Sequence, residues 1–231
     1  MQRAESPTRR WLRSAVSIFR KDWRSELRTR YVMSALVMFV VTTISIVVFA
    51  LGSESAPLDA LSGMLWVVIF FAAMSGLSRT FVTEEERGTA MTLQLLATPG
   101  AVFFGKLLFN LVLVLGVNAL TVLLYAIFLT GFVVKTFSIF FFTILFGSVG
   151  LAAASTIIAG IIAKANTKGT LYPVLSFPIL LPLLLTCING TRLATEGAFI
   201  EEAYGEFQFL VSYIIVVVTA SSVLFEYIWK D

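Results

Sequence analysis

The chain has 231 residues, of which 58% are hydrophobic and only 13% are charged. Soluble globular proteins carry about 25% charged residues, so this composition excludes an ordinary soluble domain and indicates an integral membrane protein. The formal net charge of +3 is small, and we interpret the basic residues as membrane-topology signals rather than as a nucleic-acid surface.

Histidine is absent and Cys187 is the single cysteine. An internal disulfide, a haem-attachment motif, a histidine zinc site and a Ser-His-Asp triad are therefore excluded. We expect no catalytic residue in this chain, no metal site and no directly bound cofactor.

Residues 1–30 are expected to form a tail and an amphipathic interfacial helix. Between Trp11 and Arg30, apolar side chains recur on one helical face and arginines on the opposite face. Such a helix lies in the lipid headgroup region with its apolar face toward the acyl chains. A mitochondrial-type targeting peptide is the alternative, although two acidic residues are unusual for one. The residues predicted to contact the membrane interface are Phe19, Trp23 and Leu27.

Residues 31–231 are expected to form one all-α transmembrane domain. About 20 apolar residues are needed to cross a bilayer as a helix, and six segments satisfy this requirement. The predicted spans are Tyr31–Leu51, Leu58–Leu77, one within Val102–Val134, one within Thr136–Ala163, Leu171–Ile188 and Phe207–Trp229.

The basic residues predict an orientation for these spans. With the N-terminus inside, all but two of the 17 lysines and arginines fall on the cytoplasmic side. The two exceptions are Lys135 and Arg192, and the predicted outer loop from Thr191 to Glu206 is acidic. Both termini and the 79–100 and 164–170 loops are therefore predicted to be cytoplasmic.

Small and polar residues mark contacts between the spans. The fourth span repeats a small residue every four positions, which lets helix backbones approach closely in lipid. Prolines in the fifth span each remove a backbone donor, so this helix is either kinked or mobile. In the third span, Lys106, Asn110 and Asn118 are intramembrane polar groups and candidates for function. The predicted packing or hinge residues are Ser148, Ala152, Thr156, Gly160, Pro173, Pro178 and Pro182.

The longest polar interruption runs from Arg79 to Gly100. Thr83 and Glu86 have capping-box spacing, and three consecutive glutamates suit the positive end of a helix dipole. We expect one short surface helix with apolar contacts, ended by Pro99 and Gly100. A solvated charged loop is the alternative.

One apparent nucleotide motif is dismissed. Residues 100–106 match G-x-x-x-x-G-K, but Leu107 stands where a phosphate-binding loop needs Ser or Thr for Mg²⁺. No strand precedes the motif and a membrane span follows it.

The E-R-G-T sequence at 86–89, a short apolar helix and then Thr98-Pro99 resemble the coupling segment of type-2 ABC exporter permeases. More narrowly, the chain resembles the haem exporter protein B family, also called cytochrome c maturation protein B (CcmB). The likeness covers nearly the whole chain, including residues 28–30, 65–79, 105–107 and 171–182.

This resemblance implies a bacterial inner-membrane permease subunit for cytochrome c biogenesis. It implies as partners an ABC ATPase subunit that hydrolyses ATP, other cytochrome c maturation membrane subunits, and a second permease copy. Haem would be a ligand that the whole complex transports or handles when it releases a haem-loaded chaperone. The second, third and fifth spans would transmit the ATP-driven motion. The implied ATPase interface is Glu84, Glu85, Glu86, Arg87, Gly88, Thr89, Met91, Leu93, Leu95 and Leu96.

Two other functions share much of this pattern. E-R-G-T also occurs in type-2 permeases that export a lipid, a polysaccharide or a drug. A membrane assembly scaffold that transports nothing is the third possibility.

Overall fold

The computed structural model describes residues 7–52, 56–86, 88–129, 131–164 and 171–230, and the statements below refer to these residues. They form helices and no strand, which confirms the predicted all-α class. The elements are α1 (Pro7–Thr29), α2 (Tyr31–Leu51), α3 (Leu58–Leu77), α4 (Val82–Glu86), α5 (Ala90–Leu96), α6 (Pro99–Phe128), α7 (Phe137–Ala163), α8 (Leu171–Glu196), the 3-10 helix η1 (Ile200–Ala203) and α9 (Tyr204–Lys230).

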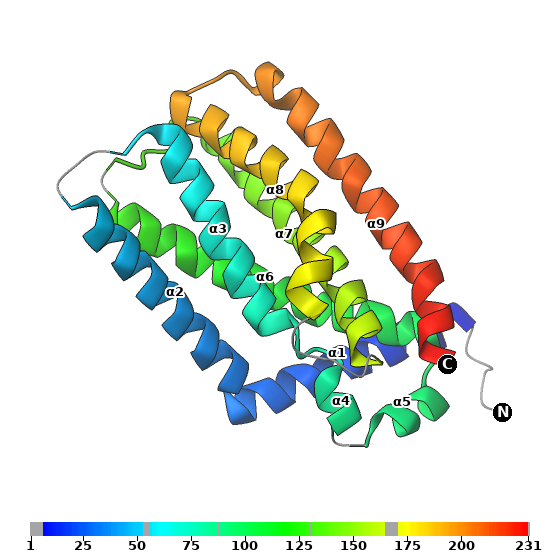
Figure 1. The fold of residues 1–231 in the computed structure, drawn as a ribbon. Helices are drawn as coiled ribbons and strands as arrows, with labels where there is room; N and C mark the ends of the chain where they lie inside the picture. The colour runs from blue at the N-terminus through cyan, green and yellow to red at the C-terminus, as the bar shows by residue number, and fades with distance from the viewer. Residues whose placement is uncertain (1–6, 53–55, 87, 130, 165–170, 231) are drawn as a thin grey trace.

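Six of the described helices, α2, α3, α6, α7, α8 and α9, are long and apolar enough to cross a membrane. Figure 1 shows them side by side in one bundle, with α2 and α9 at opposite edges. The core is centred on α7, which packs against α6, α8 and α9, and every residue of α7 from 150 to 160 is buried. The outer faces of α2 and α9 are exposed and apolar, as expected for helices that contact lipid.

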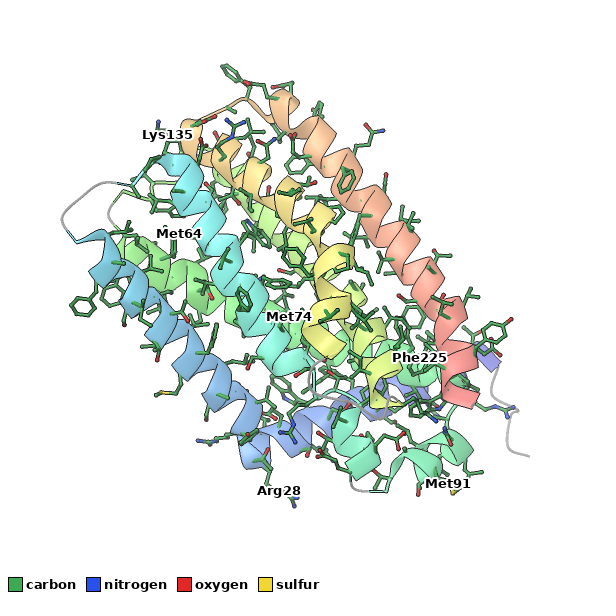
Figure 2. The ribbon with its side chains drawn as sticks, viewed as in Figure 1. Arg28, Met64, Met74, Met91, Lys135 and Phe225 are labelled. Carbon is green, nitrogen blue, oxygen red and sulfur yellow. The ribbon has the colours of Figure 1, made fainter. Side chains whose placement is uncertain are left out.

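Helices α1, α4 and α5 gather at one end of this bundle. In Figure 1, α1 runs across the ends of the spans, beside α4, α5 and the C-terminal end of α9. Figure 2 shows Arg28 and Met91 at this end and Lys135 at the opposite end. The segments predicted to be cytoplasmic therefore lie together, although only residue 164 of the 164–170 loop is among the described residues.

Three predicted span boundaries are wrong. The sixth span, α9, begins at Tyr204 rather than at Phe207. The third span begins at Pro99, before the predicted region, because proline at the first helical position already has the backbone angle of a helix. The fifth span continues to Glu196 rather than ending at residue 188. Arg192 pairs with Glu196 one turn later at 3.5 Å and donates to Asn189 at 2.9 Å, so the chain stays helical where an outer loop was expected.

The expected single surface helix is in fact two helices. Gly88 has a φ of 67°, a left-handed conformation that separates α4 from α5. The predicted capping box is also wrong, because Thr83 lies inside α4 and its hydroxyl donates to the Arg79 carbonyl at 3.2 Å. The Glu86 carboxylate instead pairs with the Arg79 guanidinium at 3.2 Å.

Candidate functional site

An ionic cluster of Lys21, Asp22, Glu84 and Lys106 joins α1, α4 and α6. Lys106 is buried, and its ammonium lies 3.0 Å from a carboxylate oxygen of Glu84 and 3.0 Å from one of Asp22. It also donates to the Thr80 carbonyl at 3.0 Å. Lys21 of α1 is a second cation on the Glu84 carboxylate. Three helices that are distant in the sequence are thus held together by charge.

Glu84 is the centre of the ionic cluster. Its second carboxylate oxygen accepts a hydrogen bond from the Thr89 hydroxyl at 2.6 Å, across the turn at Gly88. Burial alone would lower the pKa of the Lys21 ammonium, but the negative charges of Asp22 and Glu84 outweigh burial and raise that pKa. Because a buried charge that loses its partner is strongly destabilising, these side chains hold α4 in place. Glu84 therefore faces α1 and α6, on the inside of the predicted ATPase interface.

A polar ladder continues from the ionic cluster into the bundle. It consists of Lys106, Asn110 and Asn118 on α6 with two hydroxyl residues of the small-residue stripe on α7. The Asn110 amide donates to the Thr156 hydroxyl at 2.8 Å, and the Asn118 amide donates to the Ser148 hydroxyl at 2.7 Å. All five side chains are buried. The intramembrane polar residues and the small-residue stripe, which the sequence presents as separate features, are one contact between two helices.

The other two members of the stripe, Ala152 and Gly160, are also buried in α7. A Cβ atom at Gly160 would lie 3.2 Å from the Phe225 ring of α9. The Phe225 ring packs between those of Phe81 and Phe103, at centroid distances of 5.3 Å and 5.4 Å. Gly160 thus leaves room for an aromatic cluster that joins α6, α7 and α9 near α4.

One side of α5 is attached to the bundle. Ala90 is buried, and Leu93 is half-buried and packs against the hydrophobic core. The Gln94 side-chain amide donates to the Trp229 carbonyl at the end of α9, at 2.7 Å. These contacts fix how α5 lies against the bundle.

The opposite side of α5 is apolar and open. Met91, Leu95 and Leu96 are 72%, 82% and 76% exposed. They lie at the end of the bundle, where Figure 2 labels Met91. We call these three residues the α5 patch. Exposed apolar surface that is rimmed by polar groups is typical of an interaction site.

The remaining described residues of the predicted interface lie in α4 and in the turn before α5. Glu85 is half-buried, while Glu86 and Gly88 are exposed. Arg87 lies outside the described residues. The segment therefore offers charged side chains at α4 and apolar ones at α5, with Glu84 and Thr89 binding each other between them.

The amphipathic helix α1 has two contact faces. The predicted lipid-facing residues form one of them: the Phe19 and Trp23 rings stack at 6.2 Å, and Leu27 is 47% exposed. The other face docks on α6, where a Cβ atom at Gly105 would lie only 2.9 Å from the Cβ of Ile18. Sequence reasoning missed this docking face, although a glycine in an apolar span is the signal of such a close approach.

Of the three prolines in the fifth span, Pro178 and Pro182 lie inside α8, which continues through both. Pro173 lies in the first turn of α8, and its side chain is outside the described part of the chain. A hinge at these prolines stays a prediction.

Residues 100–106, which match the nucleotide motif, lie within helix α6. A phosphate-binding loop requires a turn between a strand and a helix, so this helical segment does not have its geometry.

The family of the chain is shown by a match to one protein-family model. No curated protein sequence matches the chain. The family model described as CcmB protein matches residues 13–226, a stretch that includes the ionic cluster, the polar ladder and the α5 patch. The chain therefore belongs to the CcmB family of multi-pass ABC-transporter permease components in cytochrome c maturation.

Proposed function

We propose that this chain is the permease subunit on which a partner ATPase acts, so that ATP hydrolysis drives haem handling during cytochrome c maturation. Membership of the CcmB family supports the setting. One observation carries the mechanism: the segment between α3 and α6 is attached by Glu84 on one side and exposes the α5 patch on the other.

The first step is docking of the ATPase on α5. Full burial of a large apolar side chain contributes about 1.5–3 kcal/mol, so burying Met91, Leu95 and Leu96 in a groove of the partner favours binding by several kcal/mol. The carboxylates of Glu85 and Glu86 beside the patch select a partner with a basic rim.

The second step is transmission of the movement. Moving α4 alone would pull Glu84 away from the buried Lys106. Because Lys106 keeps its contact with Asp22, losing Glu84 costs about 1.5–3 kcal/mol, the value of a hydrogen bond to a charged group. Movement of α4 is therefore carried to α1 and α6, and the polar ladder carries it from α6 to α7. The sequence favoured α3, α6 and α8 as the transmitting spans, whereas the buried polar contacts favour α6 and add α1 and α7.

The wider assembly belongs to the same proposal. The bundle spans the inner membrane of a bacterial cell. Its α4–α5 end faces the cytoplasm, because the ATPase that binds there needs cytoplasmic ATP. A second copy of the chain and other cytochrome c maturation membrane subunits complete the path. Haem is the ligand that the complex handles, and ATP hydrolysis resides in the partner.

Co-purification of the partner ATPase from membranes tests the docking step. In the L95S/L96S double variant, affinity for the ATPase should fall roughly a hundredfold or more, because the apolar burial of two leucines is lost. Both residues are exposed, so the variant should accumulate normally. F199S is the matched control, since Phe199 is also exposed, at 76%, but lies between α8 and η1 at the opposite end.

Undiminished co-purification with L95S/L96S would refute the docking step. Normal cytochrome c maturation when the partner ATPase cannot hydrolyse ATP would refute the transport mechanism and would favour a scaffold.

A further inference from the structure

Two adjoining cavities lie beside the elbow between α1 and α2. Each has a volume of about 240 Å³. The first reaches the ionic cluster and is lined partly by Glu26, and the second lies between α2 and α3. Val32, Gly76 and Arg79 line both cavities, so we treat them as one elbow cleft.

The elbow cleft lies where two spans meet the membrane surface. α2 begins at Tyr31 and α3 ends at Leu77, so both ends are at the level of the lipid headgroups. Figure 2 shows the elbow by its labelled residue Arg28. Tyr31 and Ala35, which line the second cavity, are exposed on the outside of the bundle. In a bilayer, the molecule that reaches this opening is a phospholipid.

Glu26 supplies a negative charge in the cleft for which the described part of the chain provides no ion-pair partner. Its side chain is buried, with 7% of the residue exposed, and one carboxylate oxygen accepts the Met33 N–H at 2.9 Å. Among the described residues, no cation forms an ion pair with it, whereas the two cations and two anions of the ionic cluster neutralise one another. A buried carboxylate without a counter-ion is costly, so Glu26 favours a cation that enters from outside.

Arg79 supplies a positive group in the same cleft. Its guanidinium lies over the Tyr31 ring at 5.9 Å and forms an ion pair with the exposed Glu86. The Arg79 side chain is 47% exposed, so its other N–H groups are accessible. A planar guanidinium with free donors is well suited to a phosphate group.

We propose that the elbow cleft binds one phosphatidylethanolamine molecule from the surrounding leaflet. Its phosphate binds Arg79, its primary ammonium binds Glu26, and an acyl chain lies along the bundle surface beside Ala35 and Ser75. A headgroup that carries both charges satisfies both residues. Phosphatidylcholine lacks an N–H to donate to Glu26, and phosphatidylglycerol lacks a cation. The bound lipid joins α1 to α3 at the elbow, and this inference does not depend on docking of an ATPase.

Native mass spectrometry of the purified protein tests the site with three lipids of identical acyl chains. The wild-type protein should bind phosphatidylethanolamine roughly tenfold more tightly than phosphatidylcholine or phosphatidylglycerol, as expected for one charge-assisted hydrogen bond. In E26Q, the glutamine still accepts the Met33 N–H, and the preference over phosphatidylcholine should disappear. In R79Q, the affinity for all three lipids should fall. The matched control is E196Q/R192Q, which neutralises an exposed pair at the opposite end and should leave the preference unchanged.

Several outcomes would overturn the inference. They are equal binding of phosphatidylethanolamine and phosphatidylcholine by the wild-type protein, a preference that persists in E26Q, and tighter binding of phosphatidylglycerol. A co-purifying basic peptide that occupies the cleft in place of lipid would do the same.

Should E26Q fail to accumulate, stepwise N-methylation of the lipid on the wild-type protein decides. Affinity must then drop at the third methyl group, which removes the last N–H, and a gradual decline without that drop contradicts the site.

Discussion

Replacing Glu84 by glutamine tests the ionic cluster directly, because it removes the charge and keeps the size of the side chain. Lys106 would still lie 3.0 Å from Asp22 and would still donate to the Thr80 carbonyl. The free energy of unfolding should therefore fall by about 1.5–3 kcal/mol, the value of a hydrogen bond to a charged group. The larger loss of about 3–5 kcal/mol applies to a buried ion left without any partner.

Thermal unfolding in detergent measures this change. Cys187 is buried, so a thiol-reactive dye reports unfolding without any added label. At about 2–4 °C per kcal/mol, E84Q should lower Tm by roughly 3–12 °C. The control E196Q breaks an exposed pair with Arg192 and should lower Tm by about 2 °C or less. In E84Q/K106M, the loss should be smaller than the sum of the two single losses by about 1–3 kcal/mol. A Tm for E84Q within the range of the control, or strictly additive losses, would refute the role given to Glu84.

Three further predictions address other contacts. G105A should destabilise the protein by about 1–3 kcal/mol, because the new methyl group meets α1, whereas G116A on the same helix has nothing within 4 Å and should be near neutral; equal Tm values would contradict the docking of α1. Cysteine at Glu202 should react with an impermeant thiol reagent in intact cells and cysteine at Met91 should not, and the reverse pattern would invert the topology. W23D should lower the amount of protein in the membrane, because it places a charge on the predicted lipid-facing side of α1, and an unchanged amount would argue against an interfacial helix.

The sequence predicts the spans best where polar or turn-forming residues bound them. Arg30 precedes α2, and Gly52 and Pro57 lie between α2 and α3, so both helices match their predicted limits. The end of α8 was missed because a charged residue such as Arg192, after an apolar span, is typical of a loop. The contacts of Arg192 with Asn189 and Glu196 keep the helix intact. These contacts are local, but they are polar and so do not appear in the hydrophobic periodicity of the sequence.

The candidate site was predicted only in part. Lys106 and Glu84 each stand out in the sequence, but they are 22 positions apart and no sequence pattern pairs them. Their contact depends on how α4 and α6 pack, which is a tertiary property. The docking face of α1 was hidden for a different reason. Asp22 lies on that face, and a charged residue in an amphipathic helix is ordinarily assigned to solvent, whereas here it binds Lys106.

The most direct test of the proposed mechanism is photo-crosslinking in intact cells. A photoreactive amino acid at position 95, which is 82% exposed on α5, should form a covalent link to the partner ATPase. The same amino acid at position 199, at the opposite end of the bundle, should not. A link to the ATPase from position 199, or its absence from position 95 while the complex is intact, would contradict the assignment of α5 as the docking helix.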